Sequence, residues 1–194
     1  SIDIQSKKQE SPSSAYKSLT VGLRQIYRDP VLLIIALLAL SINFLLSLLN
    51  GGGVKLLNSI SGGSVSDYGF INSTASIVCV FCLLISPLAV SRIGLWKFGT
   101  CVALLAPITF FLLPLSISTV AFAFSITSFL CMDSLFSVFI RTVRANRIPS
   151  EVYGSTVALF SLIVIVPMPL AGLTLSLTAP IFSTSSLFMA SSVI

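Results

Sequence analysis

The sequence has no histidine and few charged residues. Without histidine, a catalytic histidine, a histidine metal ligand and a histidine pH switch are all excluded. Charged residues make up only 9% of the 194 residues, whereas a soluble domain carries about 25%, because water must solvate its surface. Together with a mean hydropathy of +1.04, this scarcity of charge indicates a protein with much of its surface in lipid.

The four cysteines all lie in apolar stretches, so they do not indicate a disulfide framework. Cys79 and Cys82 form a CxxC pair, which in a soluble protein is typical of redox or zinc chemistry. Here the pair lies inside the run VCVFCLLI, and a free cysteine packs like a small hydrophobic residue. We therefore predict buried or lipid-facing thiols, with no metal site and no cofactor.

Apolar stretches long enough to cross a bilayer recur along the chain, since a helix needs about 20 residues to do so. We predict spans at about 31–49, 68–90, 98–113, 116–140 and 151–177, and a truncated sixth span at 181–194. Gly51–Gly53 are expected to end the first span, and residues 54–67 to form a polar loop. The predicted fold class is all-α, a polytopic membrane protein built as a six-helix bundle over residues 30–194.

Residues 1–29 are predicted to be a cytoplasmic linker that contains an interfacial amphipathic helix. Residues 1–14 have the composition of a flexible linker. After them Leu19, Leu23 and Ile26 recur at helical spacing, while Arg24 and Arg28 occupy the other side, a pattern typical of a helix that lies on a membrane surface.

The basic residues support one topology. If six helices alternate, all Lys and Arg except Lys55 fall on the same side: Lys7, Lys8, Lys17, Arg24, Arg28, Arg92, Lys97, Arg141, Arg144 and Arg147. Cytoplasmic loops carry such an excess, so the N-terminus and the basic loops should be cytoplasmic. Clusters between long uncharged stretches also argue against a nucleic-acid partner.

Three segments carry a resemblance to a known family. RTVRANRIPSEVYG, ending at Gly154, resembles the loop between helices ten and eleven of major facilitator superfamily exporters, closest to the macrolide-efflux and siderophore-export group. LRQIYRDPVL, which follows the linker, resembles the entry of their central loop into helix seven. PLAVSRIGLWK resembles the signature GxxxDRxGRK, of which Arg92, Gly94 and Lys97 remain. Pro87 and Ser91 replace the Gly and the Asp of that signature.

The resemblance implies helices seven to twelve of a twelve-helix transporter. Such a protein exports a small organic molecule, drug-like or siderophore, by alternating access in the bacterial inner membrane, with protons as the expected coupling ion. Its partners would be the lipid bilayer, the N-terminal six-helix half and the substrate. The gating loops would then contain Arg92, Gly94, Lys97, Arg141, Arg144, Pro149, Glu151 and Gly154. A simpler reading of the last loop is a helix start, with Ser150 as the cap and Glu151 at the positive end of the helix dipole.

Asp133 is the only charged residue well inside a predicted span, where a carboxylate costs about 2.5 to 3.5 kcal/mol. Ser137 and Arg141 follow it at i+4 and i+8, so we expect a polar strip that leads to the cytoplasmic side. Asp133 would exchange a proton or meet a cationic group of the substrate. Alternatively, a neighbouring helix hydrogen-bonds it, or an arginine reaches it.

Two neutral polar stripes lie near the outer ends of the first two spans: Asn43, Ser47 and Asn50, and Asn72 with Ser76. They would line a vestibule or serve as hydrogen bonds between helices. Pro167, Pro169 and Gly172 should kink the fifth span, and Pro107 the third, either for gating or simply because proline is frequent in membrane helices.

Other function classes fit less well. A membrane-embedded enzyme needs a cluster of catalytic groups at one depth, and a lone Asp133 does not supply it. A structural subunit or channel half would favour rings of like residues. We therefore predict a transporter rather than an enzyme, with no catalytic residues.

Overall fold

The computed structural model describes residues 12–178 and 181–193, and this part of the chain is all-helical. The helices are α1 (Pro12–Arg28), α2 (Pro30–Ser61), α3 (Val65–Ile93), α4 (Leu95–Phe111), α5 (Thr119–Arg147), α6 (Ser150–Ile165), α7 (Pro167–Thr178) and α8 (Thr184–Ser191). The prediction of an all-α fold is confirmed for these residues. Residues 1–11 of the predicted linker lie outside the described part.

Four segments are long and apolar enough to cross a bilayer, namely α2, α3, α5 and the continuous Ser150–Thr178 that contains α6 and α7. The chain is therefore a membrane-embedded helical protein. The apolar helix α4 is shorter, at 17 residues, and α8 has only eight residues. The structure thus bears out the membrane class, while a count of six crossings stays a prediction.

The prediction that Gly51–Gly53 end the first span is wrong, because α2 continues through them to Ser61. The residues expected to form a polar loop are therefore mostly helical. The glycines instead allow close packing. A Cβ at Gly51 would lie 2.7 Å from Leu175 of α7, and one at Gly52 would lie 3.0 Å from Phe188 of α8.

Gly53 has the same role toward α3. A Cβ there would lie 2.5 Å from Oη of Tyr68, whose hydroxyl donates a hydrogen bond to the carbonyl of Leu49 at 3.1 Å. Such close contact explains why three glycines stand within a helix despite their low helix propensity. Tertiary packing thus outweighs the local preference.

The helix ends follow local chemistry. Asp29 caps α2 by accepting a hydrogen bond from the N–H of Val31. Gly94 alone joins α3 to α4 with φ of +84°, a conformation that favours glycine. At the position of the predicted kink in the fifth span, α6 ends at Ile165 and α7 begins at Pro167. Pro107, in contrast, lies within α4 and does not end it.

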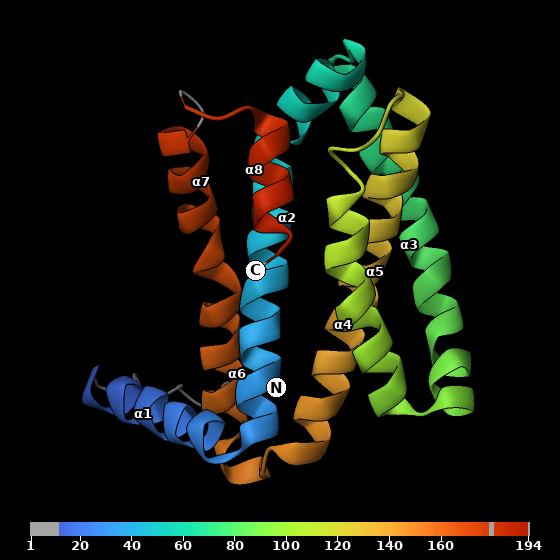
Figure 1. The fold of residues 1–194 in the computed structure, drawn as a ribbon. Helices are drawn as coiled ribbons and strands as arrows, with labels where there is room; N and C mark the ends of the chain where they lie inside the picture. Colours follow the sequence, from blue (N-terminus) through green and yellow to red (C-terminus); the bar gives the residue numbers. More distant parts are fainter. Residues whose placement is uncertain (1–11, 179–180, 194) are drawn as a thin grey trace, which may run out of the picture.

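The helices form two groups (Figure 1). In one group α3 and α4 pack on α5, and in the other α2 packs on α7 while α1 packs on α6. Cys79 of α3 and Cys131 of α5 are both buried, with their sulfurs 3.5 Å apart, as predicted for small apolar residues.

Helix α1 lies across the end of the bundle where α2 begins (Figure 1). Gly22 brings it against α6, since a Cβ there would lie 2.7 Å from the carbonyl oxygen of Ser155. Ile26 is buried, whereas Leu23 and Tyr27 remain exposed. The position of α1 on a membrane surface stays a prediction.

Candidate functional site: a polar cavity between three helices

An ion pair sets the register between α2 and α5. Nη1 of Arg147, at the end of α5, donates to both carboxylate oxygens of Asp29, at 2.9 and 2.8 Å. The Arg147 guanidinium also lies over the Trp96 ring at 5.8 Å from its centroid. This latch of Asp29, Arg147 and Trp96 therefore connects the starts of α2 and α4 with the end of α5.

The latch places Asn43 and Asp133 at the same depth. Each lies fourteen residues from its member of the ion pair, which corresponds to about 21 Å of helix in the two antiparallel helices. The predicted span ended at residue 140, only seven residues after Asp133. Since α5 continues to Arg147, Asp133 lies at its midpoint.

A cavity of about 220 Å³ lies between α2, α5 and α6 and extends from this depth to Arg144 in the last turn of α5. Its lining combines one carboxylate, two guanidinium groups, an amide and two hydroxyls with an apolar remainder. The lining residues are Ala39, Asn43, Asp133, Phe136, Ser137, Ile140, Arg141, Arg144, Phe160, Ser161 and Val164. The predicted strip of Asp133, Ser137 and Arg141 thus lies along one wall.

Asp133 has no hydrogen bond or ion pair with any residue in the described part of the chain. It also borders a second cavity of about 210 Å³, lined by Leu83 of α3 together with Ser134, Ser137 and Arg141. The alternative prediction was that a neighbouring helix hydrogen-bonds the Asp133 carboxyl. No residue in the described part of the chain makes that bond. Asp133 is half-buried and faces open space on both sides of α5.

Arg144 contributes the second guanidinium group to the cavity. Its Nε is buried without a hydrogen-bond partner, and its guanidinium lies over the Phe160 ring, 5.2 Å from the centroid. Such a cation–π contact holds the group in place while leaving its other N–H groups free. Arg144 was predicted in a gating loop, but the structure places it in the cavity wall.

The predicted vestibule residues do not join this cavity, apart from Asn43. The side chains of Asn43, Ser47, Asn72 and Ser76 each donate to the backbone carbonyl four residues earlier, and Ser76 and Asn50 are exposed. Their hydrogen bonds are therefore satisfied within their own helices. Facing polar stripes remain a prediction.

The other predicted gating residues lie at helix ends. Arg92 and Lys97 are exposed on either side of the Gly94 turn. Pro149 is the N-terminal cap of α6, and Glu151 lies in its first turn, where a negative charge suits the helix dipole. The capping role predicted for Ser150 is wrong, because its hydroxyl instead donates to Glu151.

Gly154, Pro169 and Gly172 are exposed positions of α6 and α7 that do not line the polar cavity. A Cβ on Gly154 or Gly172 would meet no atom within 4 Å, so neither glycine is required by packing.

Sequence reasoning missed the latch and the contribution of α6. Asp29 and Arg147 are 118 residues apart, and only a correct helix pairing brings them together. The one available signal was that Asp29 stands at a membrane boundary beside a proline. Ser161 and Phe160 gave no signal, because serine and phenylalanine are common in apolar helices.

The fold and the cavity define a membrane-embedded helical protein with an unpaired carboxylate at the midpoint of α5 and two arginines toward the end of that helix. Comparison with protein-family models, curated proteins and solved structures finds no match to this chain.

Proposed function

We propose that this chain forms one half of a secondary transporter of the major facilitator type, which exports a small organic molecule across a bacterial inner membrane. The N-terminus would be cytoplasmic, a second six-helix half would complete the transport path, and protons would supply the coupling. The proposal rests on the sequence resemblance together with the polar cavity. A buried ionisable group within a membrane bundle is costly and marks a functional pathway by default.

The observation that carries the proposal is the unpaired Asp133, which lines a cavity together with Arg141 and Arg144 of the same helix. Protonation of Asp133 would raise the net charge of the lining by one unit. A substrate that donates a hydrogen bond to the Asp133 carboxylate would compete with the proton, so each would lower the affinity of the cavity for the other equally. This reciprocity is the physical basis of proton-coupled transport.

The polarity of the lining also bears on the substrate. With two guanidinium groups and one carboxylate, the cavity favours a molecule that carries an anionic group beside hydrogen-bonding groups. The aromatic ring of Phe160 and the neighbouring aliphatic side chains suit a compact apolar body. We therefore expect organic anions to be transported in preference to cations.

Export from cells that express the complete gene tests the proposal. Accumulation of the anion fluorescein and of the cation ethidium would be measured with and without a protonophore. We expect lower fluorescein accumulation than in empty cells, and loss of that difference when the proton gradient collapses. Asp133→Asn should abolish the response to the gradient.

Asp67→Asn is the matched control, because Asp67 carries the same group in a capping box at the other end of the bundle. An asparagine at this position keeps an oxygen that can accept from the N–H of Ser64, so transport by Asp67→Asn should remain normal. Wild-type export by Asp133→Asn with unchanged pH dependence would remove Asp133 from the mechanism.

Water access to the cavity can be tested without a substrate. Ser137→Cys should react with a charged, membrane-impermeant thiol reagent in inside-out vesicles, whereas Leu104→Cys, on the exposed apolar face of α4, should not. Equal reactivity of the two cysteines would contradict an aqueous pathway at Asp133.

A further inference from the structure

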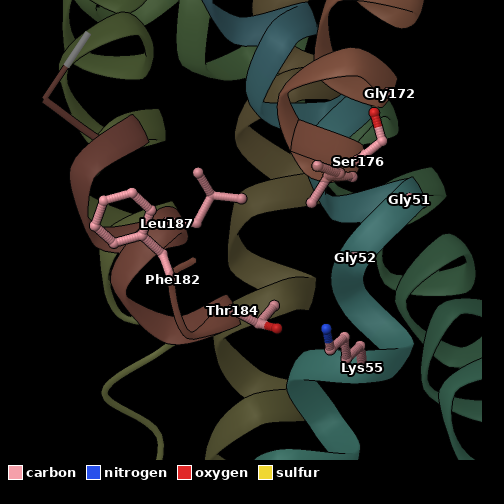
Figure 2. A pocket seen from close by; sticks show the side chains of 9 residues that line it. Gly51, Gly52, Lys55, Gly172, Ser176, Phe182, Thr184 and Leu187 are labelled. Carbon is pink, nitrogen blue, oxygen red and sulfur yellow. The ribbon is translucent and has the colours of Figure 1, made fainter. Parts of the chain in front are cut away.

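Another cavity, distinct from the two beside Asp133, lies between α2, α7 and α8, at the end of the bundle away from α1. Its volume is about 420 Å³, room for about a dozen non-hydrogen atoms at ~30 Å³ each. Its lining residues are Gly51, Gly52, Lys55, Gly172, Leu175, Ser176, Phe182, Thr184 and Leu187. Gly51 and Gly52 form its wall on α2, while leucine and phenylalanine side chains form the other apolar walls (Figure 2).

One charged group lies at the edge of this cavity. Figure 2 shows the amine of Lys55 and the hydroxyl of Thr184 on the same side of the cavity. The ring of Phe182 lies away from both groups. Lys55 makes no ion pair or hydrogen bond with any residue in the described ranges. No acidic residue is among those that line the cavity. The cavity is therefore apolar with a single cationic end.

The depth of Lys55 matches a lipid headgroup. From Pro30 to Lys55 the helix α2 rises about 38 Å. A bilayer has a hydrocarbon core about 30 Å thick and reaches about 40–45 Å with its headgroup regions. With Pro30 at one boundary of the core, Lys55 therefore lies among the opposite headgroups, while Leu175 and Leu187 can meet the adjoining acyl region.

Lys55 is also distant from the other cationic side chains in the described part of the chain. All other lysines and arginines whose side chains the structure describes lie toward the end of the bundle that carries α1 (Figure 1). No neighbouring cation shares its attraction for an anion, and the lysine is not needed for a structural ion pair. A lysine beside a glycine-lined apolar cavity at headgroup depth thus offers both parts of a site for a charged amphiphile.

We propose that this outer cavity binds an anionic amphiphile, with its phosphate or carboxylate group on Lys55 and Thr184 and its chain between Phe182, Leu175 and Leu187. The chemistry is shared by an anionic phospholipid of the membrane and by a free single-chain anion. The site is independent of the proposed transport function and does not involve Asp133.

Native mass spectrometry of the detergent-solubilised full chain tests the site. Titrations would use phosphatidylglycerol, zwitterionic phosphatidylcholine of the same acyl chains, and dodecyl phosphate. We expect phosphatidylglycerol to bind more tightly than phosphatidylcholine. Lys55→Gln should weaken its binding by about fivefold, the effect of one lysine near a membrane surface, and Lys55→Arg should retain it.

A variant that fills the cavity distinguishes a lipid bound inside it from a lipid that only contacts a surface lysine. A Cβ on Gly172 meets no atom within 4 Å, so Gly172→Leu can place its side chain in the cavity without displacing the protein. It should abolish the preference for phosphatidylglycerol. Gly69→Leu is the matched control, because Gly69 is also open but does not line the cavity.

The outcomes decide the proposal and the source of the ligand. Preference for phosphatidylglycerol assigns the site to a membrane lipid, whereas binding of dodecyl phosphate alone assigns it to a free amphiphile. Equal binding of all three molecules, with no effect of Lys55→Gln, would overturn the proposal. A preference for phosphatidylglycerol over phosphatidylcholine that persists in Gly172→Leu would also overturn the proposal.

Discussion

The latch between Asp29 and Arg147 gives the sharpest prediction about stability. Asp29 has two roles, because one oxygen accepts from the N–H of Val31 and both accept from Arg147. Three variants separate them. Asp29→Asn keeps a side chain that caps the helix and removes the charge, Asp29→Ala removes both, and Arg147→Ala removes the ion pair and the contact with Trp96.

The expected losses follow from the exposure of the groups. The Arg147 side chain is 40% exposed and that of Asp29 is 18% exposed, so solvent screens the pair and its coupling should be about 0.2 to 1 kcal/mol. Loss of an aspartate cap costs about 1 kcal/mol, and an exposed cation–π contact is worth about 0.5 to 1 kcal/mol. Asp29→Ala should therefore lose about 1 to 2 kcal/mol and Asp29→Asn less than about 1 kcal/mol.

The assay is the free energy of unfolding in mixed micelles, titrated with a denaturing detergent and followed by the fluorescence of Trp96, the single tryptophan. A double-mutant cycle with Asp29→Asn and Arg147→Ala isolates the coupling energy. A coupling of zero, or an equal loss in Asp29→Asn and Asp29→Ala, would refute the assignment of two separate roles to Asp29.

Two further predictions concern pH and packing. Burial raises the pKa of Asp29, but the hydrogen bond from Arg147, the N–H of Val31 and the positive charge outweigh it, so the pKa lies below 3.8. The ion pair therefore contributes stability above about pH 4 and loses it as the pH falls through the folded pKa. The gap in melting temperature between the wild type and Asp29→Asn should close below about pH 4, and a constant gap would contradict this. Gly53→Ala should cost about 1 to 3 kcal/mol, because its Cβ would meet Tyr68. Gly69→Ala, with open space, should be neutral or stabilising by up to about 1 kcal/mol. Equal melting temperatures for the two glycine variants would exclude the packing role of Gly53.

Only some of the cavity-lining residues could be assigned to a common site from the sequence. Asp133, Ser137 and Arg141 follow a helical row, so their common wall could be predicted from spacing alone. Asn43 and Arg144 also line the cavity, yet the analysis assigned them to a vestibule and to a gating loop. Their true position depends on how α2 pairs with α5, which spacing within one helix does not specify.

Hydropathy and local signals determined by themselves that this chain is helical and embedded in a membrane, where its long apolar runs lie and where Pro167 interrupts a helix. These properties depend on neighbours along the chain and on the poor solvation of apolar side chains. Only the tertiary structure decided that α2 passes through Gly51–Gly53, that Asp29 meets Arg147, and which polar groups share a cavity. Each of these depends on side chains from another helix, since a glycine ends a helix or admits a neighbour according to what packs against it.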